Sequence, residues 1–126
     1  MFDKIELFNM SQAMARHAAA RQDVAAQNTA NADTPGYLAR DLADFADSYQ
    51  GAGGALRQTR PGHLGTSPGQ VDLTAQVTRN AMSPNGNAVS LEDEMVKSVA
   101  ARREHDLALA IYKSSLGILR SSLGRR

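Results

Sequence analysis

Cysteine and tryptophan are absent from this sequence of 126 residues, and aromatic residues make up only 5% of it. The absence of cysteine excludes a disulfide framework, a zinc–thiolate site and a thiol nucleophile. No apolar run approaches the roughly 18 residues that a membrane-spanning helix needs, and the N-terminus lacks the apolar stretch of a cleavable leader. We therefore expect no membrane insertion and no export by a conventional leader peptide.

An excess of charge of either sign is also missing. Lys and Arg number 14 against 13 Asp and Glu, which gives a formal net charge of +1. Proteins that bind the phosphate backbone normally carry a clear basic excess, so we expect no nucleic-acid partner. The length fits one domain. Because large apolar side chains are few and scattered, we infer that other copies or other proteins complete the apolar surface of this chain.

Residues that could carry catalysis or bind a metal form no known constellation. His17 and His105 have no His or carboxylate at the i+3 or i+4 spacing that places two ligands on one helix face. No nucleophile elbow, Walker loop or dinucleotide fingerprint occurs. The acidic run at residues 92–94 is explained by its favourable interaction with the N-terminal end of a helix dipole. We therefore predict that the protein is not an enzyme, with no catalytic residue, cofactor or metal.

Strong helix formers dominate both ends of the sequence. Residues 1–32 contain neither Gly nor Pro, and their spacing predicts one helix with a narrow apolar stripe. Residues 88–126 predict a second long helix, which begins after the N-cap Ser90 and ends near Leu123. The predicted fold is therefore mainly α, with two long terminal helices that pair as a coiled coil within a single domain.

The C-terminal helix carries a heptad pattern, which is the periodicity of a coiled coil. Alternating steps of three and four residues from Met95 to Leu123 collect apolar side chains, without interruption over the second half. Ala108, Ile111 and Ile118 form a second apolar line beside the first, which indicates contact with more than one neighbour. The predicted coiled-coil interface combines the heptad positions with the stripe of the N-terminal helix: Leu7, Met10, Met14, Met95, Leu109, Tyr112, Leu116, Leu119 and Leu123.

The middle of the chain is rich in Gly and Pro. Residues 33–50 predict a turn followed by a short helix from Leu38 to Tyr49. Pro35 and Gly36 suit the two central positions of a type II turn, the second of which requires a positive φ. Residues 51–87 predict a flexible, loosely structured insert. Apolar and polar residues alternate over residues 71–77 of this insert, which is compatible with a short strand.

The segment around this turn resembles a family signature. Residues 28–41 read NTANADTPGYLARD and closely resemble the segment that joins the N-terminal helix to the rest of the subunit in flagellar rod and hook proteins, the axial family. Residues 86–95, GNAVSLEDEM, resemble the entry to the C-terminal helix of small rod proteins, and residues 59–64 more weakly resemble a segment of the proximal rod subunit. We assign the assembly turn on this basis to Asn28, Asn31, Asp33, Thr34, Pro35, Gly36 and Tyr37.

The resemblance implies a structural subunit of the proximal rod of the bacterial flagellar basal body. In that family the terminal helices pair in the inner tube of a driveshaft that transmits torque for motility. The resemblance also implies passage through the flagellar type III export apparatus and assembly in the periplasmic space. The implied partners are further copies, other rod proteins and the base adaptor FliE. Two alternatives stay open, namely another small rod paralogue and a helical adaptor or export chaperone that remains in the cytoplasm.

Overall fold

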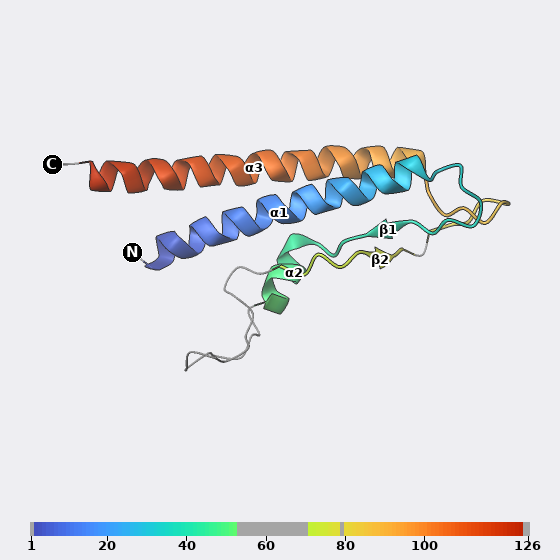
Figure 1. The fold of residues 1–126 in the computed structure, drawn as a ribbon, viewed down its shortest axis with the longest axis horizontal. Coiled ribbons are helices and arrows are strands. Elements are labelled where there is room, and N and C mark those ends of the chain that lie inside the picture. The colour runs from blue at the N-terminus through green and yellow to red at the C-terminus, as the bar shows by residue number, and fades with distance from the viewer. Residues whose placement is uncertain (1, 53–70, 79, 125–126) are drawn as a thin grey trace.

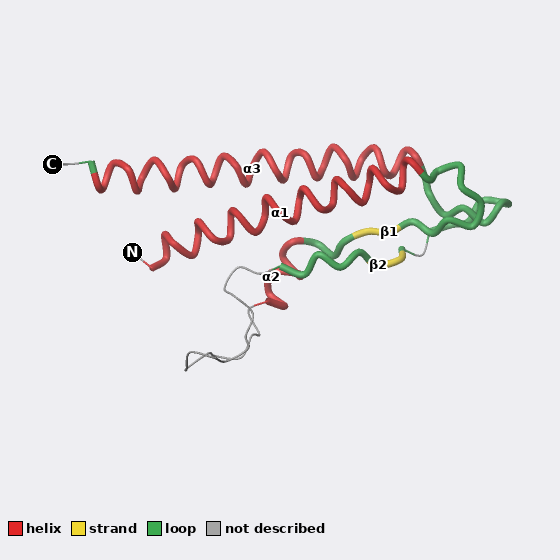
Figure 2. The backbone as a smooth tube through the Cα atoms, viewed as in Figure 1, coloured by secondary structure: helices red, strands yellow, loops and turns green. Residues whose placement is uncertain are grey.

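The computed structural model describes residues 2–52, 71–78 and 80–124. Two long antiparallel helices, α1 (Phe2–Ala30) and α3 (Leu91–Leu123), pack side by side, so that the two chain ends lie together and the connecting loops lie at the opposite end (Figure 1). A third layer of extended chain and a short helix follows the other side of α1 (Figure 2). The predicted fold class, mainly α with long terminal helices, is confirmed. The weak match at residues 59–64 lies outside the described residues.

The ends of the long helices follow local signals in the sequence. The Ser90 side chain accepts a hydrogen bond from the backbone N–H of Asp93 at 3.4 Å, which confirms the predicted N-cap. Gly124 closes α3, and its backbone N–H donates to the carbonyl of Arg120. At the end of α1 the Asn31 side chain donates to the Gln27 carbonyl at 2.8 Å, which satisfies one of the carbonyls that a helix end leaves without a partner.

Small and polar side chains line the contact between α1 and α3. Buried positions recur every seven residues on both helices, which is the repeat by which two long helices stay in contact along their length. Because these side chains are small, the two backbones approach closely, but little apolar area is buried. The buried positions are Ser11, Ala18 and Ala25 on α1 and Glu94, Ala101, Ala108 and Ser115 on α3.

The third layer holds a small antiparallel sheet. Strand β1 (Arg40–Asp41) pairs with β2 (Gln76–Val77), with Arg40 opposite Val77. Short strands in the middle of the chain are therefore confirmed. The short helix α2 (Phe45–Ala52) begins seven residues later than the predicted start at Leu38 and runs past the predicted boundary at residue 50. The prediction was wrong here because the backbone of Arg40 is held in extended form by the side chain of Asn28.

A second cluster of buried side chains joins this layer to α1. His17 is fully buried, and its Nε2 donates to the carbonyl of Ala43 at 2.8 Å. The Phe45 ring meets the His17 imidazole edge-on at 5.7 Å, and the Tyr49 ring follows at 5.4 Å from Phe45. Leu42, which precedes Ala43 in the sequence, is also buried. His17 is thus a core residue that anchors the segment leading into α2.

Candidate assembly site

Asn28 lies at the centre of the loop end of the molecule and is completely buried. Its Nδ2 donates to the Arg40 carbonyl at 2.7 Å and to Glu94 Oε2 at 3.0 Å. Its Oδ1 accepts from the Arg40 backbone N–H at 3.1 Å and from the Tyr37 hydroxyl at 3.3 Å. All four hydrogen-bonding positions of the amide are therefore occupied. One side chain of α1 thereby holds α3, β1 and the turn in a fixed arrangement.

Glu94 continues this hydrogen-bond network into a set of charged groups. It is 1% exposed, and its Oε1 accepts from Lys97 Nζ at 2.9 Å. Lys97 Nζ also lies 3.2 Å from Asp41 Oδ2, which ties α3 to β1. Burial of the ammonium lowers the pKa of Lys97, but the hydrogen bonds and charges of Glu94 and Asp41 outweigh this effect and raise the pKa above its ordinary value. Lys97 is therefore held as a cation that compensates the buried carboxylate.

Arg21 extends the charged network along α1. Its guanidinium lies 3.5 Å from the carboxylates of Asp41, Asp44 and Glu104. These three residues come from the third layer and from α3, so the guanidinium bridges all three layers. At this distance and partial exposure each ion pair contributes little on its own, and the contribution of Arg21 lies in joining several elements.

The loop before α3 is fastened to the turn after α1 by a second buried amide, Asn87. Its Nδ2 donates to the carbonyls of Asn31 and Thr34, at 2.9 and 2.7 Å. Its Oδ1 accepts from the backbone N–H of Val89 at 2.7 Å. The backbone N–H of Ala88 also donates to the carbonyl of Tyr37 at 3.0 Å. The two loops are therefore one hydrogen-bonded unit, although they are far apart in the sequence.

The turn itself has the predicted geometry. Gly36 has φ +73°, and the backbone N–H of Tyr37 donates to the carbonyl of Thr34 at 3.3 Å, as expected for Pro35–Gly36 at the centre of a type II turn. A Cβ built on Gly36 would meet no heavy atom within 4 Å. The requirement for glycine at this position is therefore a requirement of the backbone and not of space.

The structure brings most of the predicted turn residues together. Asn28, Asn31, Thr34, Gly36 and Tyr37 all take part, through side chain or backbone, in the hydrogen bonds of the loop end. The side chains of Asp33 and Pro35 are exposed on the outside of the turn. Five of the predicted turn residues thus join the loop end through hydrogen bonds, whereas Asp33 and Pro35 present exposed side chains.

Most of the predicted interface positions of α3 lie next to the buried contact with α1, whereas Tyr112 takes part in that contact. Met95, Leu109 and Leu116 each directly follow a buried residue of α3, and successive residues of a helix are turned by about 100°. They line one flank of α3, whereas Lys97 and the third layer lie on the other. Met95 is 62% and Leu123 80% exposed. Tyr112 is half-buried against the Phe8 ring at 4.5 Å, while Leu116, Leu119, Met10 and Met14 are half-buried and Leu7 is exposed.

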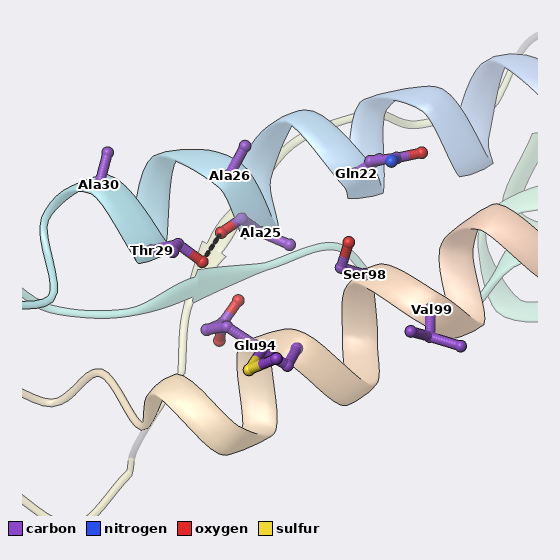
Figure 3. Close-up of a pocket in the computed structure, with 9 residues that line it drawn as sticks. Gln22, Ala25, Ala26, Thr29, Ala30, Glu94, Ser98 and Val99 are labelled. Carbon is purple, nitrogen blue, oxygen red and sulfur yellow. Dashed lines mark hydrogen bonds between the residues drawn. The ribbon is translucent and has the colours of Figure 1, made fainter.

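A groove opens on this flank where α1 and α3 approach the loops (Figure 3). It has a volume of about 550 Å³. Mostly small side chains of α1 line one side of it, and the bulkier Met95 and Val99 of α3, the latter 70% exposed, line the other. The lining residues are Gln22, Ala25, Ala26, Thr29, Ala30, Glu94, Met95, Ser98 and Val99.

Comparison with known proteins identifies the family. A family model described as flagella basal body rod protein matches residues 11–37. The chain is 32% identical to the flagellar basal body rod protein FlgB of Agrobacterium fabrum over 87% of each chain. It is 34% identical to that of Salmonella typhimurium over 78% of each. The relative from Buchnera aphidicola is 29% identical over 92% of this chain and 93% of its own length.

The chain belongs to the FlgB family of flagellar basal body rod proteins. The protein is therefore a structural subunit of the rod of the flagellar basal body, where it assembles with other rod components. Its family is a family of structural rod proteins. In the described parts of the chain no three His, Asp or Glu side chains gather as a metal site would require. None of the helices in those parts has the length and apolar character to cross a membrane.

Sequence reasoning overlooked two residues that matter at this site. The acidic run at 92–94 was interpreted as a response to the helix dipole, which suits the exposed Glu92 and Asp93 but not Glu94, whose carboxylate is buried. Asn87 lay inside a matched segment but was given no role. The sequence did hold a signal that Glu94 is buried. Glu94 stands seven residues before Ala101 and fourteen before Ala108, on the same face of α3 as these small residues.

Proposed function

We propose that this rod subunit is built into the proximal rod through the flank of α3 that carries the predicted interface, with the hydrogen-bonded loop end setting the angle of the helix pair. The observation that carries the proposal is the exposure of large apolar side chains on that flank, Met95, Leu109 and Leu123 among them. Soluble single proteins seldom expose long apolar stripes, and such stripes mark surfaces that bind partners.

The energetics favour the same flank. The fully buried part of the contact between α1 and α3 is made of Ala, Ser, Asn and Glu, so the subunit buries few of its Leu and Met side chains internally. Burying one such side chain fully contributes roughly 1.5–3 kcal/mol. Exposed Leu123 still has most of that contribution to gain from a neighbouring helix, and half-buried Leu116 and Leu119 have a smaller part of it to gain. A series of such residues, repeated in every copy, supplies an association energy that the subunit interior lacks.

The decisive experiment compares two aspartates on neighbouring faces of α3. Leu116→Asp places a carboxylate on the interface flank, where desolvation in a packed contact costs several kcal/mol. Lys113→Asp changes an exposed residue one helical step away and is the matched control. We expect cells with Leu116→Asp to export the subunit but to be non-motile, with basal bodies that lack it. Equal motility halos and equal subunit content for the two variants would refute the interface.

The wider set of partners follows from the resemblance. We propose further copies of this chain, the other rod proteins and the base adaptor FliE as its neighbours, and the flagellar type III export apparatus as its route to the periplasmic space. Disruption of that apparatus should trap the subunit in the cytoplasm. Site-specific photocross-linking from Leu123 in intact basal bodies should give products with rod proteins or FliE. Recovery of the subunit only as a soluble cytoplasmic complex would contradict this assignment.

A further inference from the structure

The loop before α3 contains the one Asn–Gly pair of the sequence, since of all its asparagines only Asn85 is followed by glycine. The backbone nitrogen after an asparagine can attack the side-chain amide carbon, and glycine hinders this attack least because it has no Cβ. A C–N bond then forms and closes a cyclic imide, while the amide nitrogen leaves as ammonia and takes the backbone N–H proton with it. Water opens the imide at one of its two carbonyls and gives aspartate or isoaspartate.

In the folded subunit the two reacting atoms are held apart by a turn. The backbone N–H of Gly86 donates to the carbonyl of Ser83 at 2.8 Å, which closes a turn over residues 83–86. Among the described residues only glycines have a positive φ, so Asn85 is not the third residue of a type II turn, and the turn is type I. A ψ of about 0° at this position directs the Gly86 nitrogen toward the Asn85 nitrogen and away from the Cβ branch that carries the amide. Formation of the imide therefore requires the turn to open.

The loop end of the molecule keeps this turn closed (Figure 1). The carbonyl of Asn85 accepts from the backbone N–H of Gly36 at 3.2 Å, and its Oδ1 accepts from the backbone N–H of Asn87 at 3.0 Å. The backbone N–H of Ser83 donates to the carbonyl of Asn87 at 2.8 Å. The Asn85 side chain is exposed to water, but the rotation that the reaction needs breaks hydrogen bonds to both loops.

We infer that Asn85–Gly86 is a deamidation site that the closed loop end protects, so that Asn85 reacts in chains whose loop end is open. The isoaspartate product also prevents later closure. Its main chain runs through the former amide carbon, which adds one carbon to the loop. The carbonyl that accepted from Gly36 becomes a carboxylate on a side branch. A subunit that waits unfolded is thereby marked, and the marked chain closes its loop end poorly.

The test compares the purified full chain in mildly alkaline buffer with and without guanidinium chloride. Deamidation is followed by the mass of the tryptic peptide of residues 80–97 and located by fragmentation. We expect Asn85 to react at least about tenfold more slowly without the denaturant, which corresponds to an opening free energy of about 1.4 kcal/mol. Asn80 is the internal control, because it lies in the same peptide but precedes alanine and should react slowly under both conditions.

A pair of variants tests the contribution of the loop end. Asn87→Ala removes the side-chain hydrogen bonds that fasten the two loops, so without denaturant Asn85 should react several-fold faster than in the wild type. Met82→Ala, at a position 65% exposed in the same peptide, should leave the rate unchanged. Circular dichroism checks that both variants keep their helices. If Asn87→Ala loses them, the wild-type comparison with and without denaturant decides alone.

Each part of the inference has an outcome that overturns it. Equal Asn85 rates with and without denaturant overturn the protection, and an Asn85 rate in denaturant no higher than that of Asn80 overturns the site. A folded Asn87→Ala variant with the wild-type rate overturns the role of the loop end. The isoaspartate form, separated and refolded, should unfold at a lower denaturant concentration than Asn85→Asp, which adds the charge without the extra main-chain carbon. Equal unfolding midpoints overturn the effect on closure.

Discussion

The two ends of the helix pair are stabilised by different interactions. At the loop end the buried side chains are amides and charged groups, and Asn28 and Asn87 have their hydrogen-bonding positions occupied within the subunit. At the end near the chain termini the contact relies on the rings of Phe8 and Tyr112 and on partly exposed leucines. At the first end the buried polar groups find their partners within one molecule, although Met95 and Val99 stay exposed there. At the second end the leucines themselves still have apolar surface to bury.

This difference separates folding from assembly. A buried amide that loses its hydrogen-bond partner costs free energy. The buried amides therefore favour the one arrangement of the backbone in which all their partners are in place. Apolar side chains carry no such demand and gain free energy from any close neighbour. A subunit that must first fold its loops and then join a polymer therefore benefits from having both kinds of contact.

The largest effect on the isolated subunit is expected from Asn28→Ala. The change removes four hydrogen bonds and leaves the buried Glu94 carboxylate with Lys97 as its main partner. Because unpaired buried polar groups are costly, we expect a loss of about 3 kcal/mol in the free energy of unfolding. Urea unfolding followed by circular dichroism measures it. Gln27→Ala, the exposed neighbour on α1, should be nearly neutral, and equal effects would refute the role of the amide.

Gly36→Val should be next in size. A β-branched residue at φ +73° costs about 2 kcal/mol from the backbone alone, since no neighbouring atom would clash. We expect normal export of the variant but failure of rod assembly, measured by the subunit content of basal bodies. Gly36→Asn is the control, because Asn adopts this conformation more readily. Normal motility of the valine variant would show that the turn geometry is not required.

Leu119→Ala tests the other end of the comparison. In the isolated subunit Leu119 is only half-buried, so its truncation should cost about 1 kcal/mol, less than the 2–5 kcal/mol of a fully buried leucine. In the rod the same change should have a larger effect, visible as basal bodies that lose the subunit at lower urea concentration. A large loss in the isolated subunit with unchanged rods would reverse our assignment of the two ends.

The smallest effect is expected from the pH dependence of Lys97. Its pKa is raised above the ordinary 10.5 in the folded state, so the stabilisation is fully present below that pH and is lost as the pH rises through the higher folded value. The wild-type subunit should therefore lose stability above about pH 10.5 more steeply than Lys97→Met. Unfolding midpoints measured from pH 8 to 11.5 test this, with Lys113→Met as the control for removal of one charge.

Local signals in the sequence predicted local structure well. Ser90 begins α3, Gly124 ends it, and Gly36 takes a positive φ, because caps and turns depend on residues that are neighbours in the chain. The start of α2 was wrong for the opposite reason. The helix was predicted to start at Leu38, but Asn28 binds the backbone of Arg40 and keeps it extended. A tertiary hydrogen bond here prevails over a weak local preference.

The packing of the two helices was harder to predict. The heptad pattern counted bulky residues and so selected the flank with Leu109 and Leu116, whereas the residues buried between α1 and α3 are Ala108 and Ser115, each one position earlier. Small residues give little signal in a hydrophobic pattern, yet they allow the closest contact. The burial of Glu94 was equally hard to predict, because its hydrogen-bond partner Asn28 lies 66 positions away in the sequence.

Asn87 has a consequence for the segment between the long helices. It binds carbonyls 56 and 53 positions earlier in the chain, so the helix hairpin is closed by side-chain hydrogen bonds close to its loops. The antiparallel pairing of β1 with β2 closes the chain a second time. Whatever lies between Asp41 and Gln76 is topologically an insertion, and doubling the length of such a loop adds only about 0.6 kcal/mol of closure entropy. A change in the length of the middle segment should therefore cost the helix hairpin little stability.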